Sequence, residues 1–170
     1  MLGLDDNPVG EHYKIFFSKI FKLESARILL CPIQLSEILN RLLRFYANKA
    51  YDKKYLPMSG AKPSRNVFYK DEYRGSEDFQ IHYQSTIDDI QSFLSHVLIA
   101  DISNKEFDNL TSFRAKNLDF NDHYLYLLAK EQSAIIVTHD ADFFELDVVV
   151  GTFNLKLYKN YTNSIKPNSW

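Results

Sequence analysis

Hydrophobic and polar positions divide the chain into short apolar runs and stretches with a helical repeat. Residues 28–33 (ILLCPI) form a short apolar run, which is typical of a strand buried on both faces. Residues 11–23 and the stretch after Pro32 instead repeat their apolar positions every three or four residues, as amphipathic helices do. The first of these helices is predicted to pack through Ile15, Phe16, Ile20 and Phe21, and the second through Leu35, Ile38, Leu39, Leu42 and Leu43.

The second half of the chain continues this alternation. Residues 96–100 (HVLIA) predict either a strand or the end of a helix over 84–95. Asp119 stands at the N-cap position of a helix that ends near Gln132, and Asp122 three positions later completes an acidic variant of the capping box. Apolar β-branched runs follow at 134–138 (AIIVT) and 148–153 (VVVGTF). Helices between apolar strands imply crossover connections, so an α/β sandwich with a mostly parallel sheet is expected.

Composition narrows the class of protein. The 170 residues are 45% hydrophobic and 25% charged, which excludes a disordered or low-complexity chain and favours one domain. Residues 51–80 hold most of the Pro and Gly signals, so an irregular insert is predicted at about 47–84. Neither a long apolar run nor a secretory signal is visible, so a cytoplasmic protein without membrane contact is expected. The single cysteine, Cys31, excludes an internal disulfide and a cysteine-based zinc site.

Charge is unevenly distributed along the chain. The net charge is −2, but residues 41–74 carry nine Lys or Arg against three acidic residues, a balance of +6. The remaining residues therefore carry −8. Such a basic stretch is either a solvated surface or a face that binds anions.

Carboxylates are the candidate functional groups at the ends of the predicted strands. Ligands of open parallel sheets bind beyond the carboxyl ends of the strands, and no nucleophile–base pair or Gly-rich phosphate loop is found there. Converging carboxylates repel one another unless a divalent cation is present, and Mg²⁺ or Mn²⁺ prefers oxygen ligands. Each acid also has an ordinary structural explanation as an ion-pair partner or a helix or turn cap. The candidates are Asp5, Glu37, Asp122, Asp140 and Asp142.

Two segments resemble the PIN domain, the nuclease fold of VapC-like toxins. Residues 119–144 (DFNDHYLYLLAKEQSAIIVTHDADFF) resemble the closing motif of this family, in which an Asp opens a helix and an apolar strand leads to Thr-Arg/His-Asp. Residues 31–42 (CPIQLSEILNRL) resemble its second motif, which carries an inward-pointing Glu. The resemblance implies a three-layer α/β/α sandwich with a central parallel sheet of four to five strands.

The resemblance also implies roles for individual residues. Glu37, Asp122 and Asp140 match the second, third and fourth acidic metal-site positions, and Thr138 matches the hydroxyl residue that holds the fourth acid. Asp142 is a candidate supplementary acid. At the N-terminus, where Asp5 and Asn7 have the spacing of the family's Asp-x-Asn, two readings stay open. Either Asp5 is the first metal-site acid, or residues 5–16 (DDNPVGEHYKIF) resemble the loop that follows a first strand which this sequence does not contain.

The basic stretch is a candidate RNA-binding surface. Lys and Arg side chains that follow phosphates, with aromatic rings that stack on unpaired bases, are typical of single-stranded RNA binding. The alternative is that the interleaved tyrosines pack the insert onto the rest of the domain. The predicted RNA-binding residues are Arg41, Arg44, Lys53, Lys54 and Arg65.

These observations lead to one preferred function and two alternatives. The preferred function is a Mg²⁺- or Mn²⁺-dependent endoribonuclease of the toxin type, for which the resemblance implies a homodimer and a cognate antitoxin partner. The first alternative is a degenerate PIN-like module that binds RNA or protein without cleavage. The second is a metal phosphatase in which Asp140 and Asp142 form the nucleophilic Asp-x-Asp.

Overall fold

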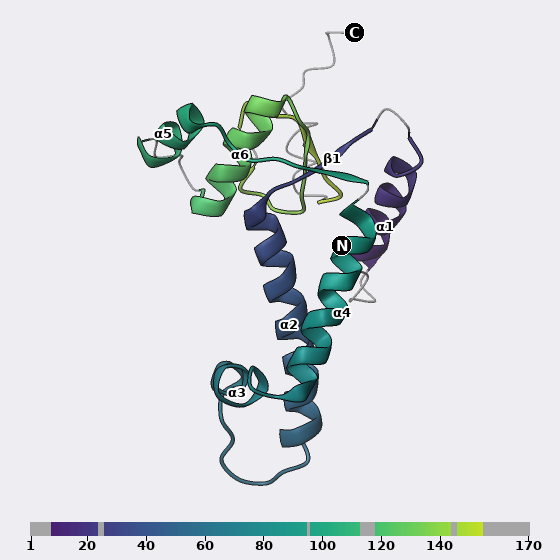
Figure 1. The fold of residues 1–170 in the computed structure, drawn as a ribbon, viewed down its shortest axis with the longest axis vertical. Coiled ribbons are helices and arrows are strands. Elements are labelled where there is room, and N and C mark those ends of the chain that lie inside the picture. Colours follow the sequence, from purple (N-terminus) through teal and green to yellow (C-terminus); the bar gives the residue numbers. More distant parts are fainter. Residues whose placement is uncertain (1–7, 24–25, 95, 113–117, 144–145, 155–170) are drawn as a thin grey trace. The chain divides into compact units, whose positions relative to one another are not determined.

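The computed structural model describes residues 8–23, 26–94, 96–112, 118–143 and 146–154 (Figure 1). Of these residues, 62% are helical. None of the helices among them is both long enough and apolar enough to cross a bilayer. The elements, in chain order, are α1 (Pro8–Ile20), β1 (Ile28–Leu30), α2 (Pro32–Tyr55), α3 (Arg65–Phe68), the π-helix η1 (Tyr69–Tyr73), α4 (Glu77–Leu94), β2 (Val97–Ile99), α5 (Asn104–Ser112), α6 (Phe120–Gln132), β3 (Ile136–Val137) and β4 (Val150–Gly151).

The predicted α/β/α sandwich is wrong. The described residues form two separate two-stranded sheets, β1–β2 and β3–β4, in place of one central sheet of four to five strands. The apolar runs were identified correctly, but only two or three residues of each one pair with a neighbouring strand. Ile135 and Val149, which would lie inside a covered sheet, are 62% and 65% exposed. Alternation of apolar runs therefore located the strands without determining how many of them pair.

The chain forms two compact units, which are described separately. The first comprises residues 1–29 and 100–170, and the second comprises residues 30–99. Residues 47–84, the predicted insert, lie wholly within the second unit, and among them only 56–64 and 74–76 are outside helices. The division into one domain with an insert stays a prediction.

The second unit is a helical hairpin in which α2 and α4 run side by side (Figure 1). Pro32 occupies the first turn of α2, where the missing N–H of proline costs no helical hydrogen bond. The Gln34 side chain reaches back and accepts a hydrogen bond of 3.0 Å from the Cys31 backbone N–H. The predicted amphipathic helix after Pro32 is thus confirmed, and it continues to Tyr55.

Aromatic rings form the core of the hairpin at the end where α3 and η1 pack against α2. The Tyr51 hydroxyl donates to the Pro63 carbonyl at 2.8 Å, which fixes the loop before α3. The Tyr73 hydroxyl is 2.7 Å from Nδ1 of His82 on α4. Because these hydroxyls bond to protein groups, the rings are buried without stranding a polar atom. The buried core residues are Leu43, Ala47, Tyr51, Phe68, Tyr69 and Tyr73.

Alkaline pH is expected to destabilise this core through Tyr73. Burial is the main cause that raises the pKa of Tyr73 from 10.0 to about 12, and the negative charge of Asp78 adds to it. The unfolded chain therefore loses the phenolic proton at a lower pH than the folded chain, so folding stability falls as pH rises from 10 towards 12. Urea unfolding at pH 9 and pH 11 measures this loss. The Tyr73→Phe variant should lose less stability over the same interval, and an equal loss would contradict the assignment.

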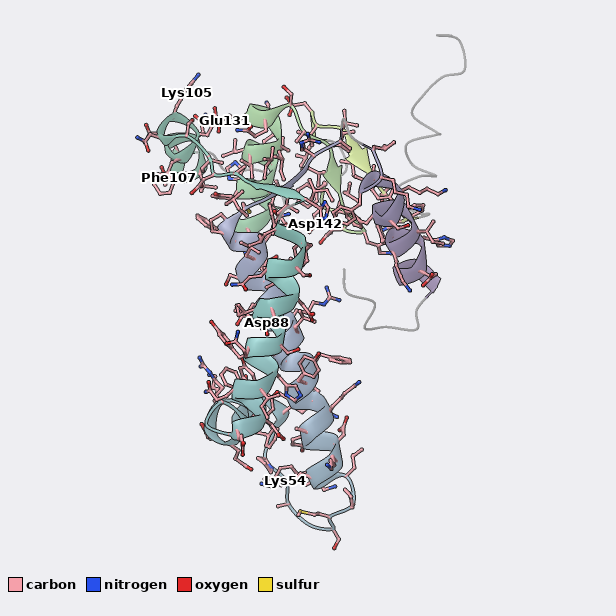
Figure 2. The ribbon with its side chains drawn as sticks, turned by 45° about the vertical axis from the view of Figure 1, so that its right-hand side comes forward. Lys54, Asp88, Lys105, Phe107, Glu131 and Asp142 are labelled. Carbon is pink, nitrogen blue, oxygen red and sulfur yellow. The ribbon has the colours of Figure 1, made fainter. Side chains whose placement is uncertain are left out.

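The first unit contains α1, α5, α6 and the β3–β4 sheet. The two strands are parallel, with Ile136 opposite Val150 and Val137 opposite Gly151. Helix α6 supplies most of the buried side chains of this unit, including Leu127 and Leu128. Polar contacts fasten α6 to its neighbours. The Glu131 carboxylate, labelled in Figure 2, accepts a hydrogen bond from the backbone N–H of Ser103, just before α5. Lys130 forms an ion pair with Asp147 at 2.8 Å.

Candidate metal centre

The N-terminus of α6 positions the first candidate carboxylate. The Asp119 side chain accepts a hydrogen bond of 2.9 Å from the Asp122 backbone N–H, so Asp119 is the N-cap that the sequence predicted. Asp122 lies in the first turn of the helix and is half-buried. Its negative charge is favourable there because the first turn presents unpaired backbone N–H groups and the positive end of the helix dipole.

The loop after β3 positions two further carboxylates. The Thr138 hydroxyl accepts a hydrogen bond of 3.0 Å from the Asp140 backbone N–H. One Asp140 carboxylate oxygen accepts another of 3.0 Å from the Asp142 backbone N–H. These two local bonds close consecutive turns, which is a common use of Thr and Asp side chains in loops. The geometry turns the chain so that both aspartates point to the same side of the loop.

Tyr13 of α1 anchors this loop to the rest of the unit. Its hydroxyl donates to the Thr138 carbonyl at 2.8 Å and accepts from the Phe153 backbone N–H at 3.1 Å, so it ties the ends of β3 and β4 together. Tyr13 is 1% exposed, and its ring packs edge-on against Phe153 and His139. The sequence analysis missed Tyr13, because the helical repeat of α1 indicated a different set of packing residues.

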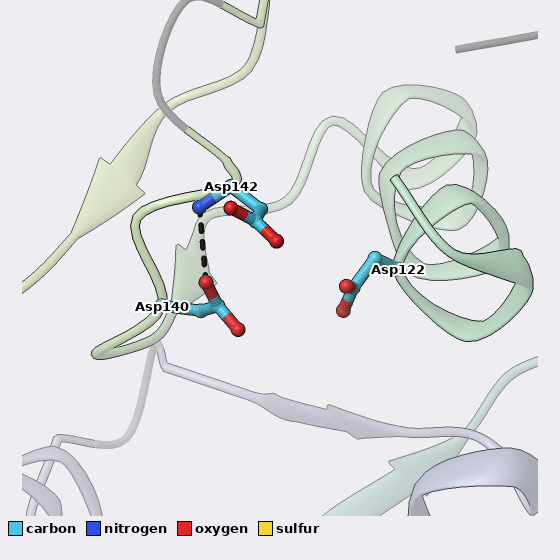
Figure 3. A group of neighbouring side chains, drawn as sticks. All are labelled: Asp122, Asp140 and Asp142. Carbon is cyan, nitrogen blue, oxygen red and sulfur yellow. Dashed lines mark hydrogen bonds between the residues drawn. The ribbon is translucent and has the colours of Figure 1, made fainter. Parts of the chain in front are cut away.

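The acidic cluster consists of Asp122, Asp140 and Asp142. One carboxylate oxygen from each residue lies within 4.8 Å of the others, and Figure 3 shows the side chains from the loop facing Asp122 on α6. Asp140 and Asp142 are exposed, so water and a substrate can approach the cluster. Carboxylate oxygens are the ligands that hard divalent cations such as Mg²⁺ or Mn²⁺ prefer, so these three residues are the ones that could hold such an ion.

The other predicted metal-site residues are not part of the described cluster. Glu37 lies on α2, in the second unit, and is exposed. Asp5 and Asn7 lie outside the described residues, so both readings of the N-terminus stay open. The structure thus brings together three of the five predicted acids, all of them from the segment that carries the closing motif.

Two of the predicted RNA-binding cations have acidic partners inside the hairpin. Lys54, at the end of the hairpin shown in Figure 2, contacts Glu72 at 2.6 Å, and Arg65 contacts Asp52 at 2.6 Å. The hydrogen bond from Lys54 lowers the pKa of Glu72, and the same bond raises the pKa of Lys54. Arg41, Arg44 and Lys53 are exposed and form no ion pair among the described residues.

The aromatic side chains of the basic stretch have two different environments. Tyr51, Phe68, Tyr69 and Tyr73 belong to the hairpin core. They pack within the hairpin, whereas the packing alternative expected the tyrosines to pack the insert onto the rest of the domain. Tyr83 is exposed, whereas Tyr46 is half-buried and stacks on His82 with ring centroids 4.1 Å apart. Most of the rings that the sequence offered for base stacking therefore stabilise the hairpin instead.

Comparisons with protein-family models, with curated proteins and with solved structures give no match for this chain.

Proposed function

We propose that the protein is a divalent-cation-dependent endoribonuclease that hydrolyses RNA phosphodiester bonds at the acidic cluster. The observation that carries the proposal is the convergence of Asp122, Asp140 and Asp142 within 4.8 Å from two separate parts of the chain. The proposal does not depend on the sandwich fold, which the described residues do not form.

The carboxylates would act mainly through their charge and position. Three aspartates this close repel one another, and a Mg²⁺ or Mn²⁺ ion would relieve that repulsion. When bound, such an ion supplies Lewis-acid chemistry, because it acidifies a water molecule and offsets the charge on a phosphate group. Asp122 would hold the ion from the helix side, and Asp140 from the loop side. Asp142, the supplementary acid, would accept a proton from the attacking water.

RNA is the proposed substrate for two reasons. The segment that contains all three aspartates, residues 119–144, resembles the closing motif of PIN-domain ribonucleases. The same chain also carries the basic hairpin, which offers cations to a polyanion. As the resemblance implies, attack by water would displace the 3′-oxygen and leave a 5′-phosphate and a 3′-hydroxyl. A toxin role, with a homodimer and a cognate antitoxin, belongs to the same proposal and rests on the resemblance alone.

Metal removal is the direct test. The purified protein should cleave a fluorescent single-stranded RNA in Mn²⁺ or Mg²⁺, lose that activity in EDTA, and recover it when excess Mn²⁺ is added. Gel analysis of the product ends should show 5′-phosphates. RNA binding without cleavage under every metal condition would contradict the proposal and favour the alternative of a module that only binds. Turnover of a small phosphate ester, but not of RNA, would favour the phosphatase.

A further inference from the structure

We infer that the hydroxyl of Tyr13 on α1 is a positioning group that sets the affinity of the acidic cluster for a divalent cation. Tyr13 is 1% exposed and lies outside the cluster, so it acts through other residues and not as a ligand. Its hydroxyl holds the loop that carries Asp140 and Asp142 in the place where both carboxylates meet Asp122. This role deepens the proposed function, on which it rests for the metal.

The Tyr13 hydroxyl takes the place of a hydrogen bond in the β3–β4 ladder. In a parallel pair, a residue that donates its N–H to one carbonyl accepts at its own carbonyl from the N–H two positions further along the partner strand. The Thr138 N–H donates to the Gly151 carbonyl at 3.1 Å, so the Thr138 carbonyl would next accept from the Phe153 N–H. The Tyr13 hydroxyl stands between these two groups instead, donating to the Thr138 carbonyl at 2.8 Å and accepting from the Phe153 N–H at 3.1 Å. The buried hydroxyl therefore ends the ladder at the residue where the acidic loop begins.

Short hydrogen bonds connect this point with the two loop carboxylates. The Thr138 hydroxyl accepts from the Asp140 N–H, and the Asp140 carboxylate accepts from the Asp142 N–H, both at 3.0 Å. The carbonyl between them in the chain, that of His139, accepts from the Asn154 side-chain amide at 2.8 Å. Both carbonyls that precede Asp140 are thus held by groups outside the loop. A shift of the Thr138 backbone would be passed on to both carboxylates.

The helix side of the cluster has a support of its own, because Asp122 is fixed by the Asp119 cap at 2.9 Å. The separation between the two sides therefore depends on where the ladder ends. The Tyr13 ring packs edge-on against Phe153 and His139, with centroids 5.0 and 6.1 Å away, and Nδ1 of His139 lies 3.4 Å from the hydroxyl oxygen. These ring contacts remain when the hydroxyl alone is removed. The freed Thr138 carbonyl and Phe153 N–H would then pair directly or bind water, and the loop would leave its position.

The Tyr13→Phe variant tests this role because it keeps the buried ring and removes only the hydroxyl. Calorimetry of the full chain with Mn²⁺ alone, without RNA, measures the dissociation constant and the number of sites per chain. We expect Mn²⁺ to bind about 10- to 100-fold more weakly, the usual loss when a group that orients metal ligands is removed. A merely structural role would lower the number of folded sites per chain and leave the dissociation constant of those sites unchanged.

Tyr124→Phe is the matched control in the same unit. Tyr124 is also buried, at 6% exposure, and its hydroxyl donates to Asp101, before α5 and away from residues 138–142 in the sequence. This variant loses a tyrosine hydroxyl of the same kind, but its Mn²⁺ dissociation constant should stay at the wild-type value. An unchanged dissociation constant in Tyr13→Phe, or an equal loss of affinity in both variants, would overturn the inference.

A double variant shows whether Tyr13 acts through the loop. Asp140→Asn removes one loop carboxylate, so adding Tyr13→Phe to it should weaken Mn²⁺ binding by a smaller factor than Tyr13→Phe does alone. Equal factors in the two backgrounds would contradict action through the loop. If Asp122→Asn weakens Mn²⁺ binding and Tyr13→Phe does not, the positioning role fails and the proposed function stands. If the wild-type protein binds no Mn²⁺, both fail.

Discussion

An Asp122→Asn variant is expected to cleave RNA on the order of 100-fold or more slowly than the wild-type protein in Mn²⁺. Changes to groups that only orient metal ligands already cost about 10- to 100-fold in affinity or activity, so loss of a ligating charge should cost at least as much. Asparagine has nearly the shape of aspartate, so the change removes charge with little change in packing. Calorimetry should show weaker Mn²⁺ binding together with the lower cleavage rate.

Asp119→Asn is the matched control on the same helix. Asp119 caps α6 through its side-chain oxygen, and asparagine is an equally good N-cap residue, so stability should be retained. Asp119 is outside the acidic cluster, and its variant should therefore cleave at the wild-type rate. If Asp122→Asn cleaves as fast as Asp119→Asn, Asp122 is not a metal ligand and the proposed site is wrong. Parallel purification of the two variants also controls for contaminating ribonucleases.

A Phe68→Ala variant is expected to lower the free energy of unfolding by about 3–5 kcal/mol, the usual cost of removing a buried phenyl ring. Phe68 is 5% exposed, and its ring packs against Tyr51, Tyr55 and Tyr73 with centroids 5.5, 5.8 and 6.1 Å away. The short helix α3 has few other buried side chains to hold it against α2. The measurement is urea unfolding followed by circular dichroism.

The neighbouring residue provides the control for this core prediction. Val67 is 47% exposed, and Val67→Ala should change stability by less than about 1 kcal/mol because it leaves no buried cavity. Both variants place alanine in α3. The difference between their free energies of unfolding therefore reports the loss of core packing and not a change in helix propensity. Similar losses in both variants would contradict the packing of Phe68 between the helices.

Local sequence signals predicted the helices well where caps and repeats agreed. The leucine repeat indicated α2, and Asp119 indicated the start of α6. These signals are reliable because capping and helical hydrogen bonds involve residues only a few positions apart. Pro32 was assigned to the strand run 28–33, but the strand ends at Leu30 and Pro32 begins α2. The packing face of α1 was less predictable. Ile15 and Phe21 were expected to be buried but are exposed, whereas Tyr13 is buried.

The sheet was mispredicted because strand pairing depends on distant partners. The runs at 134–138 and 148–153 each contain a strand, but only two residues of each run pair in the ladder. A run of β-branched residues favours extended backbone. Whether the run pairs in a sheet depends strongly on the tertiary context. Much of the chain length is instead used by α2 and α4, with 24 and 18 residues.

For the candidate site, the sequence by itself determined the cap that presents Asp122, because capping joins residues only three positions apart. The contact between Thr138 and Asp140 was implied by the resemblance alone, and the bond from Asp142 to Asp140 was not predicted. Only the tertiary structure decided that the carboxylates of the helix and of the loop meet within 4.8 Å. It also decided that Tyr13 braces the loop from 125 positions away, and that Lys54 and Arg65 bind acids of their own hairpin. Such long-range pairings depend on how helices and strands pack, and residue spacing alone does not encode them.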